Sequence, residues 1–142
     1  MTPTLTDCLL IIDVQNDFCP GGALEVPTGD EVVPLINRLT HHFSHRILTQ
    51  DWHPPGHLSF ASSHAQAAPL ETIELDYSTQ VLWPDHCVQE TPGAAFHAGL
   101  DIPHAAEVIR KAEDRDLFRS AMANAGLECA RSGVARSMDD AR

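Results

Sequence analysis

The segment Cys8-Leu-Leu-Ile-Ile-Asp-Val14 decides the fold, because it is an apolar run that a single carboxylate interrupts. A strand that is buried on both faces, as in a parallel sheet, has this composition. Residues 15–29 follow it and are rich in proline and glycine, so they are expected to form a loop. A buried strand that leads into a long loop is therefore the first expected unit.

An amphipathic helix is expected next, and the side chain of Asp30 is placed to cap its N-terminus. The apolar residues that follow recur at helical spacing and predict one buried stripe. These residues are Val32, Leu35, Ile36, Leu39 and Phe43. Residues 46–50 (Arg-Ile-Leu-Thr-Gln) then predict a second strand. Strand, helix and strand in this order predict a right-handed parallel crossover.

The rest of the chain contains one more expected strand, at residues 105–110 (Ala-Ala-Glu-Val-Ile-Arg). Residues 51–80 are expected to be a long irregular connection, which in a small domain is usually functional or disordered. A short helix is expected within residues 81–99 and a weak helix at residues 120–130. These elements predict an α/β fold with a parallel sheet.

The composition excludes several classes of protein. The chain has 142 residues, with 20 acidic and 9 basic side chains and a net charge of −11, which argues against a nucleic-acid partner. No apolar run reaches the roughly 18 residues of a membrane span, and the N-terminal residues do not resemble a signal peptide. Four cysteines without a Cys-x-x-Cys pair argue against a disulfide framework. A cytoplasmic location is therefore expected.

Polar side chains stand at the ends of all three expected strands: Asp13, Asp51 and Lys111. Ligands of open parallel sheets bind beyond the carboxyl ends of the strands. One such residue is most simply a charge at the start of a loop, but three at matching positions favour a site. Within its apolar run, Asp13 either caps nearby backbone, pairs with Lys111 or accepts a proton from a nucleophile.

A candidate metal site begins with the pair Asp51-Trp-His53. Residues i and i+2 of an extended backbone point to the same side, so one carboxylate oxygen and one imidazole nitrogen can share an ion. His86 is a candidate third ligand, and His57 is a second candidate. Such a set suits zinc, manganese or iron, whereas the alternative is that these histidines lie on surface loops.

Four segments carry a resemblance to a known family. They are Leu-Ile-Ile-Asp13-Val-Gln-Asn-Asp-Phe18-Cys-Pro-Gly-Gly, Thr-Gln-Asp51-Trp-His53-Pro-Pro-Gly-His57-Leu-Ser-Phe, Leu-Trp83-Pro-Asp-His86-Cys-Val-Gln and Val-Ile-Arg-Lys111. Together they resemble the nicotinamidases of the isochorismatase-like cysteine hydrolase superfamily over roughly residues 8–118. The resemblance implies a three-layer α/β/α fold with a parallel sheet, incomplete at the C-terminal end. Residues 1–118 would form this partial hydrolase domain, and residues 119–142 a divergent tail.

The resemblance also implies an activity: hydrolysis of nicotinamide to nicotinate and ammonia, in NAD salvage, through an Asp-Lys-Cys triad. Asp13 would be the general base and Lys111 would stabilise charge. Asp51, His53 and His86 would hold a divalent metal ion, zinc first, with manganese or iron as alternatives. Phe18 and Trp83 would stack on the pyridine ring of the substrate. His57 would act, if at all, through water. The expected partner is this small molecule, and a homo-oligomer is compatible with the family.

The sequence departs from the family at the nucleophile. The family's cysteine follows a later strand in a segment resembling Gly-x-Ala-Thr-Asp-x-Cys, which this sequence lacks. Cys129 has no apolar strand before it, and Cys19 and Cys87 stand at other positions of the family's motifs. We therefore expect a truncated or frame-shifted chain with little or no turnover and an unpaired sheet edge that favours aggregation. The alternatives are an inactive module that binds metal and substrate, and another cysteine hydrolase of the superfamily.

Overall fold

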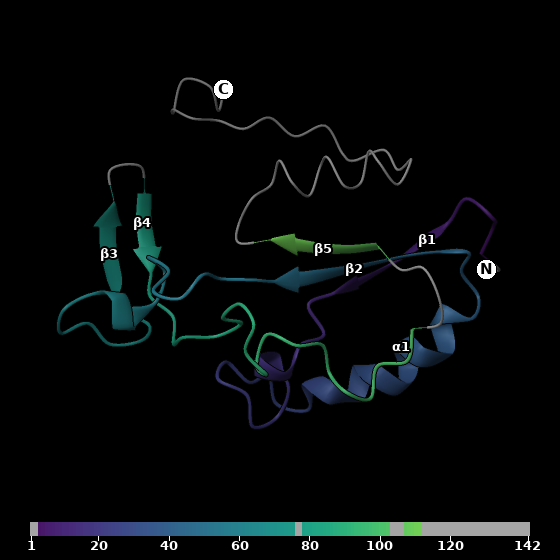
Figure 1. Ribbon diagram of the computed structural model, residues 1–142, viewed down its shortest axis with the longest axis horizontal. Helices are drawn as coiled ribbons and strands as arrows, with labels where there is room; N and C mark the ends of the chain where they lie inside the picture. Colours follow the sequence, from purple (N-terminus) through teal and green to yellow (C-terminus); the bar gives the residue numbers. More distant parts are fainter. Residues whose placement is uncertain (1–2, 76–77, 103–106, 112–142) are drawn as a thin grey trace, which may run out of the picture.

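A three-stranded parallel sheet lies at the centre of the structure, a computed structural model that describes residues 3–75, 78–102 and 107–111 (Figure 1). Its strands, in the order β1-β2-β5, are β1 (Cys8–Ile12), β2 (His45–Asp51) and β5 (Glu107–Lys111). Ile11 pairs with Leu48, and Leu48 pairs with Val108. The α/β class, the parallel sheet and the three expected strands are confirmed, with bounds that shift by one or two residues.

One helix, α1 (Val32–Thr40), packs on one face of this sheet (Figure 1). The core between them contains Ile11 from β1, Val14 from the loop that follows β1, Leu48 from β2 and Val33 from the helix. The predicted stripe is largely wrong, since Val32, Leu35 and Leu39 are 45%, 48% and 37% exposed. The prediction holds for Ile36, which packs against the core, and Val33 and Thr40 are buried in place of Val32 and Leu39.

The start of α1 also differs from the expectation. A 3₁₀ turn, η2 (Gly29–Glu31), precedes the helix, so Asp30 lies within that turn. Glu31 occupies the N-cap position of α1, and no side chain caps it by a hydrogen bond. The capping role predicted for Asp30 is therefore wrong. Pro34 is the third residue of the helix, where its missing N–H removes no helical hydrogen bond.

The other face of the sheet is less covered than the sequence predicts. Ile12 is 60% exposed and Leu10 is 36% exposed, whereas the central strand β2 buries both Ile47 and Leu48. Burial of β1 on both faces is therefore wrong for the described residues. Among the described residues α1 is the one α-helix. The second helical layer of the expected three-layer fold is therefore not part of the described structure. The expected domain boundary at residues 118–119 and the expected helix at residues 120–130 lie outside the described residues.

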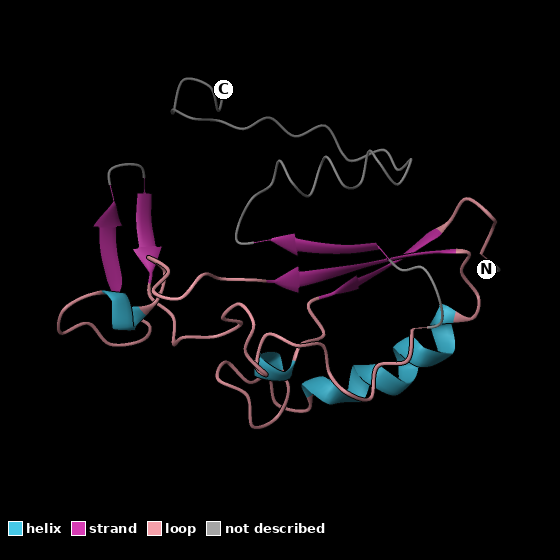
Figure 2. Cartoon of the chain, in the orientation of Figure 1, coloured by secondary structure: helices cyan, strands magenta, loops and turns pink. Residues whose placement is uncertain are grey.

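A hairpin of two antiparallel strands, β3 (Thr72–Leu75) and β4 (Ser78–Val81), stands apart from the sheet (Figure 2). The sequence interpretation treated this stretch as irregular, which is wrong here. The exposure of β3 alternates along Thr-Ile-Glu-Leu, the period of a strand with one covered face. Residues 82–99, which follow β4, form turns, bends and isolated bridges and contain no helix, contrary to the expectation. No helix among the described residues is long and apolar enough to cross a membrane.

Candidate metal and catalytic site

The carboxyl ends of the three parallel strands meet at one edge of the sheet. Asp51 is the last residue of β2 and is paired in register with Lys111, the last residue of β5. Asp13 directly follows β1, and its N–H donates to the Thr49 carbonyl at 3.3 Å. The backbone positions of the three predicted residues are therefore neighbours. The side chain of Lys111 lies outside the described part of the structure.

Asp51, His53 and His86 form a compact group of potential metal ligands. Asp51 Oδ2 lies 3.3 Å from His53 Nδ1 and 3.4 Å from His86 Nε2. One ligand atom from each residue lies within 4.8 Å of the others. Both imidazoles are buried and the carboxylate is half-buried. Two imidazole nitrogens and one carboxylate oxygen are a donor set that zinc and related divalent ions accept, so the residues fit the ion that the sequence predicts.

The backbone fixes which nitrogen of His86 faces this group. His86 Nδ1 lies 2.8 Å from the Pro84 carbonyl, which can only accept, so Nδ1 donates and Nε2 faces Asp51. Burial lowers the pKa of His86, but the bonds to Asp51 and Pro84 and the charge of Asp17 outweigh it and raise the pKa above its ordinary value. A divalent ion would take the place of the proton that these groups stabilise on Nε2.

The three histidines of this region pack around one phenylalanine. Phe60 is fully buried, and its ring centroid lies 5.1 Å from that of His53, 5.8 Å from His57 and 5.6 Å from His86. His57 is 4.8 Å from His53 between ring centroids, and its Nδ1 bonds the Ser59 hydroxyl at 2.7 Å. His57 is therefore adjacent to the group of three ligands without being a member of it. Sequence reasoning missed Phe60, although it ends the same motif.

The two predicted stacking residues are placed differently. The Phe18 ring lies edge-on to His86, with centroids 5.8 Å apart, so it borders the ligand group. Trp83 is held through its backbone, since its N–H donates to Ser59 and its carbonyl accepts from Ala61. Contact of either ring with a substrate stays a prediction.

Asp13 has an unusual backbone conformation at the edge of the sheet. Its φ is 50°, in the left-handed region that few residues other than glycine adopt and in which aspartate and asparagine are enriched. Asp13 Oδ1 accepts a hydrogen bond from the Thr49 hydroxyl at 2.6 Å. This bond fixes the carboxylate on the side of β2 that leads to Asp51, which is compatible with the predicted general base.

Cys87, the residue after His86, does not have the properties of a nucleophile. Its side chain is fully buried. Burial raises the pKa of the Cys87 thiol, and the negative charges of Asp51, Asp17 and Asp13 raise it further. A thiol that stays protonated is a poor nucleophile. This agrees with the sequence analysis, which does not assign Cys87 as the nucleophile. Cys129 lies outside the described residues.

Alkylation of the native protein tests the burial of Cys87. Iodoacetamide is expected to modify Cys87 about tenfold or more slowly than the half-buried Cys8, because access to Cys87 requires local opening. Peptide mapping by mass spectrometry reads each cysteine separately, and a sample in urea provides the control in which both react alike. Equal native rates would contradict the described burial.

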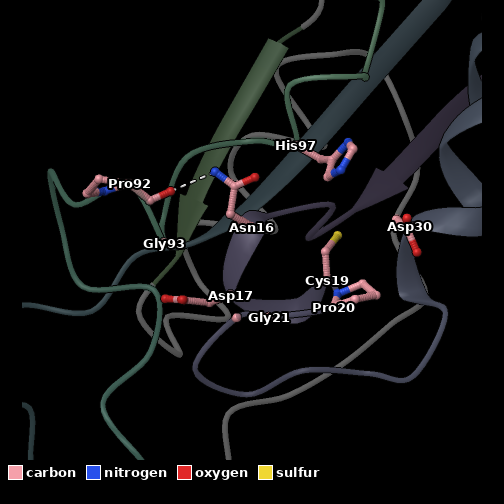
Figure 3. A pocket seen from close by; sticks show the side chains of 10 residues that line it. Asn16, Asp17, Cys19, Pro20, Gly21, Asp30, Pro92, Gly93 and His97 are labelled. Atoms are coloured by element: carbon pink, nitrogen blue, oxygen red, sulfur yellow. Dashed lines mark hydrogen bonds between the residues drawn. The ribbon is translucent and has the colours of Figure 1, made fainter.

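A separate cavity of about 360 Å³ lies between the loop after β1 and the loop that follows His86 (Figure 3). Asp17, Cys19, Asp30 and His97 are among the residues that line it. Asp51, His53 and His86 do not line it. Figure 3 shows Asn16 bonded to the Pro92 carbonyl across one side, at 2.7 Å, so the two loops are tied together there.

Comparison with known proteins identifies a family and several similar proteins. Residues 7–125 match the isochorismatase domain family. A nicotinamidase of Acinetobacter baylyi is 50% identical over 109 residues, which are 77% of this chain and 51% of that protein. The chain spans about half the length of that protein and of a nicotinamidase of Escherichia coli that is 47% identical to this chain. In a separate match, 36 residues of this chain are 58% identical to part of the carbamoyl phosphate synthase large chain of Pseudomonas putida. That part is 3% of the length of the large chain.

Two solved structures resemble the described fold. A nicotinamidase/pyrazinamidase of Acinetobacter baumanii superposes with a TM-score of 0.72 at 52% identity, over 76% of this chain and 52% of that one. A pyrazinamidase of Pyrococcus horikoshii, solved in complex with zinc, superposes with a TM-score of 0.64 at 32% identity, over 85% of this chain and 65% of that one.

Proposed function

Because the chain belongs to the isochorismatase family, we propose that it functions in the metal-dependent hydrolysis of nicotinamide to nicotinate and ammonia, in cytoplasmic NAD salvage. The observation that carries this proposal is the convergence of Asp51, His53 and His86 beside Asp13 at the carboxyl edge of the sheet. Relatives named nicotinamidase, among them proteins 50% and 47% identical to this chain, support the choice of substrate.

Zinc is the proposed ion. Two imidazoles and one carboxylate leave at least one position open, as in catalytic zinc sites. The zinc complex of the Pyrococcus horikoshii pyrazinamidase, 32% identical to this chain, supports the choice. An ion held by Asp51, His53 and His86 would supply a positive centre that orients the pyridine ring of the substrate. His86 would contribute Nε2, which the Pro84 carbonyl already directs toward Asp51.

The proposed roles of the remaining residues follow from their positions. Asp13 would accept the proton of a nucleophile, with its carboxylate held by Thr49. Lys111 would stabilise charge opposite Asp51 in the strand register. Phe18 borders His86 and would offer an apolar face to the pyridine ring. Trp83 would contribute a second aromatic wall.

The buried thiol of Cys87 favours a second candidate function. Among the described residues Cys87 is the cysteine closest in sequence to the ligand group, and its fully buried side chain is not accessible for attack on an amide. The chain would then bind a metal ion and a pyridine carboxamide without turning it over. A third candidate is hydrolysis of another small amide or ester by the same residues.

An ammonia-release assay with the full chain loaded with zinc separates these functions. Release from nicotinamide supports the proposal. Zinc and nicotinate binding in calorimetry, with no ammonia, would replace it with the binding module. Release from a different amide but not from nicotinamide would replace it with another hydrolase. A chain that binds no zinc would overturn all three, because each candidate rests on the same ligand group.

A further inference from the structure

The residues of the candidate metal site come from separate segments of the chain, so other contacts must hold these segments in place. Asp51 ends β2, whereas His86 lies in a loop outside any strand or helix. Cys87, which follows His86, has a φ of 47°, the left-handed region. This conformation costs a residue with a side chain on the order of 1 kcal/mol, so the surrounding structure must stabilise it.

We propose that Asp17 is a positioning residue of the metal site, whose carboxylate holds the Cys87 peptide and thereby sets the place of His86. This inference rests on the proposed function, because it assigns Asp17 to the same ion. Asp17 does not face that ion as a ligand; it acts through the backbone that carries one.

The carboxylate of Asp17 is used on both oxygens. Oδ2 accepts a hydrogen bond from the Cys87 N–H at 2.7 Å, and Oδ1 accepts one from the Ala23 N–H at 3.2 Å. A bond from an N–H to an ionised carboxylate is about twice as strong as one between neutral groups. The short bond to Cys87 therefore offsets the cost of the left-handed conformation directly after His86.

The backbone of Asp17 is fixed as well. Its N–H donates to the Gly93 carbonyl at 3.0 Å, and its carbonyl accepts from the Leu24 N–H at 3.0 Å. Figure 3 shows Asp17 beside Gly93, at the edge of the cavity. A Cβ at position 93 would overlap both oxygens of the carboxylate, so only glycine leaves room for it. The position of Asp17 is therefore set by its neighbours rather than by the Cys87 bond alone.

The same short segment also holds Asp51. The side-chain amide of Gln15 is fully buried and bonds the Asp51 backbone twice: Nε2 donates to its carbonyl at 2.8 Å, and Oε1 accepts from its N–H at 2.8 Å. Gln15 and Asp17 thus anchor the backbone of two ligand-bearing segments to one turn, η1 (Asn16–Phe18) and the residue before it. This arrangement sets the distance of 3.4 Å between Asp51 Oδ2 and His86 Nε2.

Two variants disturb this bond by different routes. Asp17→Ala removes the acceptor, and Gly93→Ala displaces it while the charge of Asp17 is kept. Both are expected to weaken zinc binding by about 10- to 100-fold, the usual effect of losing a group behind a metal ligand. Asp17→Asn keeps one oxygen for the Cys87 N–H and is expected to recover part of the affinity. Asp30→Asn, which removes a carboxylate from the same cavity, is the control and is expected to bind zinc as the parent chain does.

Zinc affinity is measured by competition with a chromophoric chelator, and the visible spectrum of the cobalt-substituted chain reports the ligand geometry. Changed spectra for Asp17→Ala and Gly93→Ala, with the parent spectrum for Asp30→Asn, support the positioning role. Parent affinity and spectrum in Asp17→Ala, with only a lower Tm of the metal-free chain, would overturn it and leave the proposed function intact. A parent chain that binds no zinc would overturn both.

Discussion

Replacing Phe60 with alanine is expected to lower the free energy of unfolding by about 3–5 kcal/mol and to weaken zinc binding at the same time. Phe60 is fully buried, so the truncation removes apolar contacts and leaves a cavity. The rings of His53, His57 and His86 border that cavity, at centroid distances of 5.1, 5.8 and 5.6 Å. Rings that lose this support gain rotamers that point away from a shared ion.

Urea unfolding of the metal-free chain gives the first quantity, and chelator competition gives the second. Phe96→Ala is the matched control, because Phe96 packs against the core between α1 and the sheet rather than against the histidines. It is expected to destabilise the fold with zinc affinity unchanged. Unchanged zinc affinity in Phe60→Ala, despite the loss of stability, would separate Phe60 from the ligand group.

Replacing Asp51 with alanine is expected to remove most of the bound zinc. The carboxylate is one of three ligand groups, and the two imidazoles that remain are expected to bind at least about 100-fold more weakly, since losing a group behind the ligands alone costs 10- to 100-fold. The fold is expected to survive, because Gln15 bonds the backbone of residue 51 rather than its side chain. Zinc should therefore raise the Tm of the parent chain but not that of Asp51→Ala.

Metal analysis after dialysis gives the zinc content per chain, and a thermal scan with and without zinc gives the change in Tm. Asp85→Ala is the control, since Asp85 is exposed, adjoins His86 in sequence and bonds the Ser62 hydroxyl instead of the ligand group. Zinc content of Asp51→Ala equal to that of the parent chain would reject Asp51 as a ligand.

The sequence predicts the sheet well because β1 is an apolar run and β2 and β5 each contain a pair of β-strand-forming apolar residues between polar ones. The face of α1 was harder to predict, since Val32 and Val33 each start a stripe of helical period and only packing against Leu48 and Ile11 selects the second. The hairpin β3–β4 was missed because its strands are only four residues long and follow a stretch that Pro54, Pro55, Gly56 and Pro69 mark as irregular.

The ligand group was predictable for a related reason: Asp51 and His53 stand two residues apart, a spacing that has a geometric meaning on extended backbone. The residues that hold this group were not predictable. Gln15 bonds Asp51 from 36 residues away, and Asp17 bonds Cys87 from 70 residues away. Neither contact leaves a local pattern, because each depends on how distant loops are brought together.

The connection between β2 and β5 contains most of the candidate site, and its length adds little to the entropy of chain closure. The contact between Gln50 and Arg110 spans 60 residues, compared with 36 for the contact between Asp13 and Thr49. Closing the longer loop costs only about 0.5 kcal/mol more, because the cost grows with the logarithm of length. The strands alone can therefore set the fold, while the segment that carries the histidines is free to differ in length and sequence at almost no thermodynamic cost to the sheet.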